Sequence, residues 1–118
     1  MCFRKAVVMN IINRCVVVIR AKQPYFEWAN SFAERRGGPR MDPDRFAADC
    51  PVFLVPEPED RVDAFMRREY DRIFENYLEL WITDPDLWPQ DRDYEMFREW
   101  FDYEVHPLAF DMGEGRLR

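Results

Sequence analysis

The stretch VDAFMRREYDRIFENYLELWI, residues 62–82, carries the most regular hydrophobic pattern of the chain. Apolar side chains recur in it at intervals of three and four residues, the spacing of one face of an α-helix. Pro58 suits the first helical turn, and Asp84 lies before Pro85, where the helical conformation is disfavoured. We therefore expect one long helix that ends at about Ile82. Its apolar stripe is Val62, Phe65, Met66, Tyr70, Ile73, Phe74, Tyr77, Leu78, Trp81 and Ile82.

Two hydrophobic runs that precede this helix predict β-strands. Residues 14–20 are rich in β-branched side chains and apolar on both faces, which is typical of a central strand. Residues 52–55 form a second, shorter run. Between the two, a helix over residues 24–36 begins at a proline and ends before a glycine pair. A short helical turn over residues 42–48 begins with an aspartate cap followed by proline.

The chain after the long helix predicts one more helix and one more strand. Met96, Phe97, Trp100 and Phe101 share one face of the helix, and residues 106–112 alternate as a strand does. A right-handed crossover through the first helix would make the first two strands parallel, with the third antiparallel. We expect a two-layer α+β domain, in which helices pack on a small three-stranded mixed sheet in the order β-α-β-α-α-β.

The length of 118 residues is that of one domain, because two separate cores of this total size would each be marginal. We place the α+β domain at residues 13–112. Residues 1–12 are expected to be an N-terminal extension, partly disordered, and residues 113–118 a frayed tail. Met9 is an alternative start of the chain, and the sequence leaves open which methionine begins it.

Composition and charge exclude several classes of protein. The formal net charge of −6 disfavours nucleic acid as a partner, because phosphate binding needs a basic field. The longest aliphatic run, residues 15–19, is far shorter than the ~20 residues of a membrane span, so no membrane association is expected. Three cysteines without close spacing favour reduced thiols and a cytoplasmic protein.

The candidate chemistries of this chain are few. A single histidine, His106, and widely spaced cysteines disfavour a zinc site. No catalytic thiol is expected either, because Cys15 is predicted to lie in the core and Cys50 away from His106. Residues 84–95 resemble a calcium loop in three acids, but Trp88 and Pro89 occupy positions that need a ligand and a glycine. We therefore expect no metal, no cofactor and no catalytic residue.

One cluster of side chains nevertheless predicts a site. Ligands of α/β units favour the carboxyl ends of parallel strands, next to helix N-termini. If the first two strands are parallel, that end gathers cations, a carboxylate and an imidazole that suit a small anionic metabolite. The alternative is that the cations pair with acids of the long helix, while the histidine satisfies backbone groups. The predicted site residues are Arg20, Lys22, Gln23, Trp28, Glu57 and His106.

Trp88 is a candidate interaction residue, because it lies in the loop between two helices. It is either a plug over the helix hairpin or an exposed anchor of the kind that protein interfaces favour. Trp81 and Trp100, in contrast, have helical spacing and are expected in the core.

Several segments resemble a family of small uncharacterised bacterial proteins. The shared pattern is KQPxxxW at residues 22–28, WxxDPxxWP at residues 81–89 and FxxWF at residues 97–101. The resemblance covers nearly the whole chain from about residue 9. It implies a bacterial cytoplasmic protein with one compact domain, and it implies no activity.

Two hypotheses of function follow from these observations. Residues 57–118 carry 18 acidic and 8 basic side chains, which favours a non-catalytic interaction or regulatory module whose acidic helical surface binds a basic protein. The alternative is a binder of, or an enzyme acting on, a small anionic metabolite at the strand-end site. We also expect a homodimer, because a three-stranded sheet has edges that must be covered. An edge strand or residues 1–12 would form the contact.

Overall fold

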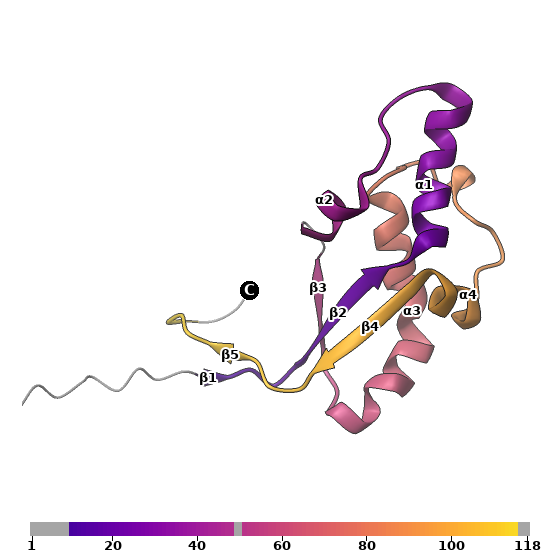
Figure 1. Ribbon diagram of the computed structural model, residues 1–118. Helices are drawn as coiled ribbons and strands as arrows, with labels where there is room; N and C mark the ends of the chain where they lie inside the picture. Colours follow the sequence, from indigo (N-terminus) through magenta and orange to yellow (C-terminus); the bar gives the residue numbers. More distant parts are fainter. Residues whose placement is uncertain (1–9, 49–50, 116–118) are drawn as a thin grey trace, which may run out of the picture.

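A computed structural model describes residues 10–48 and 51–115 of the chain (Figure 1). Cys2, Cys50 and the proposed start at Met9 lie outside the described residues. In chain order, the elements are β1 (Asn10–Ile11), β2 (Cys15–Ala21), α1 (Gln23–Arg36), α2 (Pro43–Ala48), β3 (Val52–Val55), the 3-10 turn η1 (Glu59–Arg61), α3 (Val62–Glu79), the 3-10 turn η2 (Pro85–Leu87), α4 (Tyr94–Trp100), β4 (Phe101–His106) and β5 (Phe110–Asp111).

The body of the protein is a small α+β domain, as predicted, in which helices pack on a three-stranded sheet of order β3-β2-β4. The strand expected to be central, β2, is central. Its side chains alternate between buried and partly exposed, and α1, α3 and α4 lie together on one side of the sheet (Figure 1).

The prediction of a mixed sheet is wrong, because β2 pairs antiparallel with both of its neighbours. Val18 lies opposite Val52 on β3, and Ala21 lies opposite Phe101 on β4. The crossover argument assumed that a single helix carries the chain to the far end of the sheet. The loop of residues 37–42 and α2 instead bring the chain back to the end where β2 finished (Figure 1). A return to the same end makes the next strand antiparallel.

The last helix and strand begin and end earlier than predicted. Phe101 is not the last helical residue but the first of β4, with extended φ and ψ angles of −142° and 142°. His106 ends this strand rather than beginning it. The error arose because Phe97 and Phe101 have helical spacing. Both are fully buried, and Phe101 reaches the core from the sheet instead of from the helix.

The observed bounds of α1 and α3 agree closely with those predicted from the sequence. Helix α1 ends at Arg36 and is followed by Gly37, whose φ of +71° is strained for residues that carry a side chain. Helix α3 ends at Glu79, three residues before the predicted Ile82, in tight turns where Trp81 and Ile82 N–H both donate to the carbonyl of Leu78. Among the described residues, no helix is both long and apolar enough to cross a membrane.

The core between the sheet and the helices is built mainly from aromatic rings. Tyr25 of α1, Tyr77 of α3 and Phe101 of β4 have no exposed surface, and their rings pack against one another. The Tyr25 hydroxyl donates a 2.6 Å hydrogen bond to the Tyr77 carbonyl, which joins α1 to α3. Trp81 and Trp100, expected in the core, are partly buried and pack against it.

Strands β1 and β5 form a separate ribbon that projects away from the body (Figure 1). The ribbon continues the β2–β4 pairing after an interruption. On the first strand four residues separate the paired Ile11 and Val16, whereas on the opposite strand only three separate their partners, Phe110 and His106. This mismatch is a bulge, and Pro107 within it has no N–H to donate to the ladder.

The ribbon involves residues near both ends of the chain. Residues 10–11 of the predicted extension are paired with β5, and the extension's residues 1–9 lie outside the described residues. In the predicted tail, the Gly113 N–H donates to the Asp111 carboxylate at 2.8 Å. Residues 116–118 lie outside the described residues.

Candidate functional site

The residues predicted to form a strand-end site lie at two different ends of the sheet. Arg20 and Lys22 are at the end where β4 begins, since Arg20 lies opposite Asp102. His106 lies opposite Val16 at the other end of β2. Glu57 is at that other end too, because its carbonyl accepts a 3.2 Å hydrogen bond from the Cys15 thiol. The antiparallel sheet therefore separates Lys22 from Glu57, which a parallel pair of strands would have brought together, whereas Arg20 and His106 both contact one carboxylate of β4.

The two cations have acidic partners, but these come from β4 and not from the long helix. Arg20 pairs with Glu104 at 2.9 Å, and Lys22 lies 3.8 Å from Asp102. The other oxygen of Glu104 is 3.4 Å from Nε2 of His106. One carboxylate thus lies between Arg20 and His106, which lowers the positive potential that an anionic ligand would need at this place.

The remaining predicted residues hold the chain in place. Gln23 donates to Glu27 one helical turn further along α1. The indole of Trp28 donates to the Leu87 carbonyl at 3.2 Å, and the indole of Trp88 donates to the Ile82 carbonyl at 2.7 Å. Both rings are partly buried and pack against the core. Of the two alternatives for Trp88, these contacts favour the plug.

Arg92, which the sequence analysis did not single out, lies in the loop between α3 and α4 and makes several hydrogen bonds to α3 and to its own loop. Its guanidinium donates to Asp71 at 2.8 and 3.2 Å, to Glu75 at 3.0 Å and to the Pro89 carbonyl at 2.9 Å. The hydrogen bond with Asp71 raises the pKa of Arg92, so the cation is retained. Asp71 and Glu75, four residues apart on one helix, were the sequence signal that could have indicated a bound cation. The sequence could not identify that cation as Arg92, because Arg92 is 17 to 21 residues further along the chain.

A second polar network joins the start of α3 to α4 and β4. The Tyr103 hydroxyl donates to the Asp63 carboxylate and lies 3.4 Å from the Tyr94 hydroxyl. The guanidinium of Arg98 lies 4.6 Å from the centre of the Tyr103 ring. Burial and, after it, the hydrogen bond to Asp63 raise the pKa of Tyr103. A phenol with a raised pKa stays protonated near neutral pH and does not act as a base there. We therefore interpret the network as a structural one, which joins α3, α4 and β4.

The Tyr103 network predicts a specific pH dependence of stability. A raised pKa in the folded state stabilises the protein fully below the ordinary tyrosine value of 10.0, and that stabilisation is lost as the pH rises above it. We expect Tyr103→Phe to lower the free energy of unfolding by about 1 kcal/mol at pH 8, through the lost hydrogen bond. This difference from wild type should shrink between pH 10 and 11. Urea unfolding at each pH measures it, and a constant or growing difference would contradict the assignment.

The side of the sheet that faces away from α1, α3 and α4 carries partly and fully exposed side chains. We call it the outer face, and it alternates in sequence with the buried side chains of each strand. None of its valines or leucines belongs to the hydrophobic core or packs against it. Its β4 side chains are polar, and its β2 and β3 side chains are apolar except for Arg20. The outer face comprises Val16, Val18, Arg20, Val52, Leu54, Asp102, Glu104 and His106.

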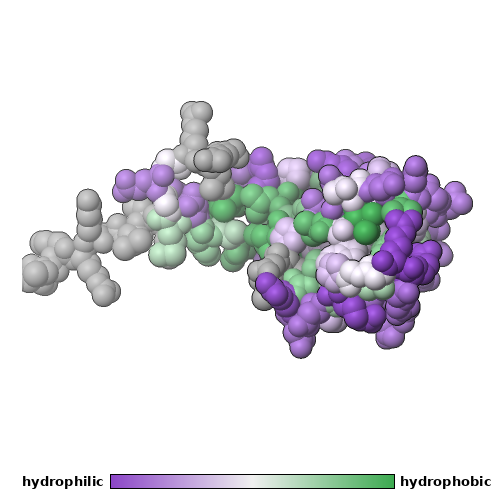
Figure 2. All heavy atoms as spheres, turned by 90° about the horizontal axis from the view of Figure 1, so that it is seen from above, coloured by the Kyte–Doolittle hydropathy of each residue, from purple (hydrophilic) through white to green (hydrophobic). Residues whose placement is uncertain are grey.

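The projecting ribbon is also apolar and exposed. We call residues 10–12 and 108–112 the arm. Ile11 and Phe110 are register partners, so their side chains share one face of the arm. In Figure 2, hydrophobic side chains lie on the arm beside hydrophilic ones and continue into the adjoining part of the body. Seven large hydrophobic side chains of the described chain are 48–71% exposed. Four are on the arm and two on the outer face; the seven are Ile11, Leu108, Phe110, Met112, Val52, Leu54 and Leu80.

No protein-family model, no curated protein and no solved structure matches this chain. In residues 10–48 and 51–115, no group of three or more His, Cys, Asp or Glu side chains is placed to hold a metal ion. Cys15 is buried, with its thiol donating to a carbonyl. The arm and the outer face are therefore the strongest candidate for a functional surface in the described structure.

Proposed function

We propose that this chain is a homotypic protein-interaction module without catalytic activity, in which the arm of each copy lies on the outer face of the other. The observation that carries the proposal is the position of the exposed hydrophobic side chains, six of which belong to the arm or the outer face. Large apolar side chains gathered in one region of a surface are typical of contact sites. A cytoplasmic location, which the cysteine content favours, is part of the same proposal.

A second copy is the occupant that these two surfaces favour. A two-stranded ribbon is at best marginally stable on its own, so the arm needs a surface to lie on. The outer face needs a cover of the same apolar character over Val16, Val18, Val52 and Leu54. Every chain carries both surfaces, and a two-fold axis pairs each arm with the other copy's face. The contact covers both surfaces at once and closes the assembly at two copies.

The acidic helical surface is a weaker candidate for the contact. Several acids of α3 already have basic partners in the same chain, since Asp71 and Glu75 bind Arg92 and Glu69 pairs with Arg72 at 3.8 Å. A carboxylate that already has a basic partner in its own chain is less available to bind a basic protein. The binding of a basic protein therefore stays a prediction from composition, and the apolar surfaces carry the proposal.

Light scattering of the full chain tests the assembly. We expect a mass of twice the 14.4 kDa of one chain. Phe110→Glu on the arm and Leu54→Glu on the outer face should each shift the mass to that of one chain, because a carboxylate buried in an apolar contact is costly. Leu80→Glu is the matched control, since Leu80 is equally exposed but belongs to neither surface, and this variant should remain a dimer.

Three outcomes would overturn the proposal. The first is wild-type protein that has the mass of one chain at high concentration. The second is a Phe110→Glu variant that still forms the dimer. The third is loss of the dimer in Phe110→Glu but not in Leu54→Glu, because arms would then contact each other and not the outer face. Circular dichroism of each variant confirms that the fold is retained, as expected for side chains about half exposed.

A further inference from the structure

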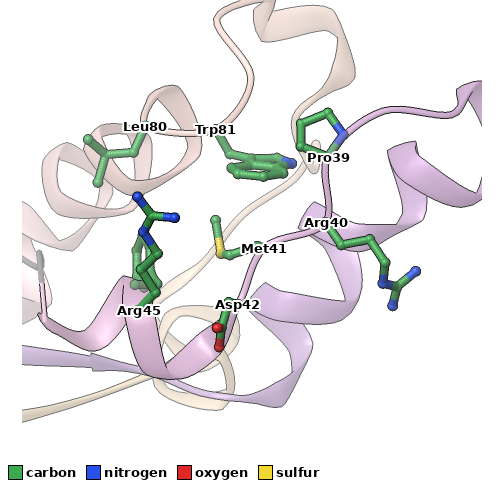
Figure 3. Close-up of a pocket in the computed structure, with 8 residues that line it drawn as sticks. Pro39, Arg40, Met41, Asp42, Arg45, Leu80 and Trp81 are labelled. Atoms are coloured by element: carbon green, nitrogen blue, oxygen red, sulfur yellow. The ribbon is translucent and has the colours of Figure 1, made fainter.

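The seventh exposed hydrophobic side chain, Leu80, lines a pocket at the other end of the molecule. The pocket lies between α2, the loop before it and the end of α3, and its volume is about 470 Å³ (Figure 3). Sites for small molecules occupy about 300–1,000 Å³ and are mostly apolar with a few polar groups. We call it the α2–α3 pocket, and it is lined by Pro39, Arg40, Met41, Asp42, Arg45, Phe46, Leu80 and Trp81.

The apolar walls of the α2–α3 pocket are fixed in position by hydrogen bonds. The indole nitrogen of Trp81 donates to the Ala29 carbonyl of α1 at 2.9 Å. The Asn30 side chain holds Met41 in both directions, accepting from its N–H at 2.7 Å and donating to its carbonyl at 3.5 Å. The Met41 and Trp81 side chains face each other across the pocket in Figure 3. Walls that are ordered in advance lose little entropy when a ligand binds.

Arg45 is the charged side chain directed toward this apolar space. Its guanidinium rises from α2 toward Leu80, whereas the guanidinium of Arg40 points away on the opposite side (Figure 3). Arg40 is 3.6 Å from Glu34. Among the residues that the structure describes, no acidic group pairs with Arg45. The carboxylate of Asp42 points away from Leu80 and Trp81 and accepts the Asp44 N–H at 3.0 Å, where it caps α2.

We propose that the α2–α3 pocket binds a small carboxylic acid with an aromatic or aliphatic body. The body of such a ligand would lie among Met41, Leu80 and the face of Trp81. Its carboxylate would accept hydrogen bonds from the Arg45 guanidinium, whose planar geometry matches a carboxylate. This proposal is independent of the homotypic contact, because the α2–α3 pocket shares no residue with the arm or the outer face.

Titration calorimetry with 4-phenylbutyrate as the probe tests the site. The matched neutral compound is 4-phenylbutyramide, which keeps the apolar body and loses the charge. We expect the acid to bind more tightly than the amide. Arg45→Gln should weaken binding of the acid by about tenfold or more and leave the amide unchanged, because it removes a charge-assisted hydrogen bond. Arg72→Gln is the matched control, because it removes the same charge from an exposed residue of α3 outside the pocket, and it should change the affinity by less than about twofold.

A second readout places the ligand in the α2–α3 pocket. The indole N–H resonance of Trp81, assigned by its loss in Trp81→Phe, should shift when the acid is added. Leu80→Ala should weaken the binding of the acid and of the amide to the same extent, since both ligands contact the same apolar wall. No binding of the acid at millimolar concentration, equal binding of acid and amide, or an unchanged affinity in Arg45→Gln would each overturn the proposal. The mass of the chain in solution is measured separately and tests the homotypic contact alone.

Discussion

Phe74→Ala is expected to lower the free energy of unfolding by about 3–5 kcal/mol, because it removes a buried ring and leaves a cavity behind. Phe74 lies in the second half of α3 and has no exposed surface. Its ring packs against Phe97, Trp100 and Phe101, so one substitution loosens contacts to both α4 and β4. Domains of this size have a net stability of only about 5–15 kcal/mol. The loss is therefore a large fraction of the total, and urea unfolding measures it.

Substitutions on the outer face provide the comparison for Phe74→Ala. Arg20→Ala and His106→Ala should each cost less than about 1 kcal/mol, since their contacts with Glu104 are exposed and such contacts contribute little. A loss at either residue that rivals Phe74→Ala would contradict this description of the sheet. It would mean that the outer face carries a buried polar network instead of a solvent-exposed one.

Arg92→Met is the second substitution with a large expected effect, about 2 kcal/mol. It removes the hydrogen bonds to Asp71 and Glu75 and the bond to the Pro89 carbonyl. Hydrogen bonds to charged groups contribute more than neutral ones, but both carboxylates are about half exposed and regain water, which limits the loss. The Arg92 side chain itself is only 14% exposed, so its stem also contributes packing.

Arg72→Met is the matched control for Arg92→Met, because it removes an arginine from α3 that is 76% exposed and pairs only loosely with Glu69. Its expected cost is below about 0.5 kcal/mol. The two variants also differ in a local readout. Hydrogen exchange of the Trp88 indole N–H should speed up in Arg92→Met, since Arg92 holds the loop that carries this ring, and it should not change in Arg72→Met. Equal stabilities of the two variants would contradict the role given to Arg92.

The candidate surfaces were partly visible in the sequence. The alternation of Leu108, Phe110 and Met112 placed three apolar side chains on one face of a strand, and all three are exposed on the arm. The pattern could not show that this strand leaves the sheet, because the bulge at Pro107 depends on which strand lies opposite. The α2–α3 pocket had no sequence signal, since Met41 and Trp81 are brought together from positions 40 residues apart.

Periodicity and local chemistry determined the elements of this protein. The repeat of three and four residues from Val62 specifies α3, the β-branched run specifies β2, and prolines and glycines mark the helix ends, because each effect acts over a few neighbouring residues. Strand direction and the grouping of charges were decided only by the tertiary structure. Whether Arg20 meets Glu57 or Glu104 depends on how the chain between β2 and β3 folds back, and that path is set by long-range packing of α1 and α2 on the core.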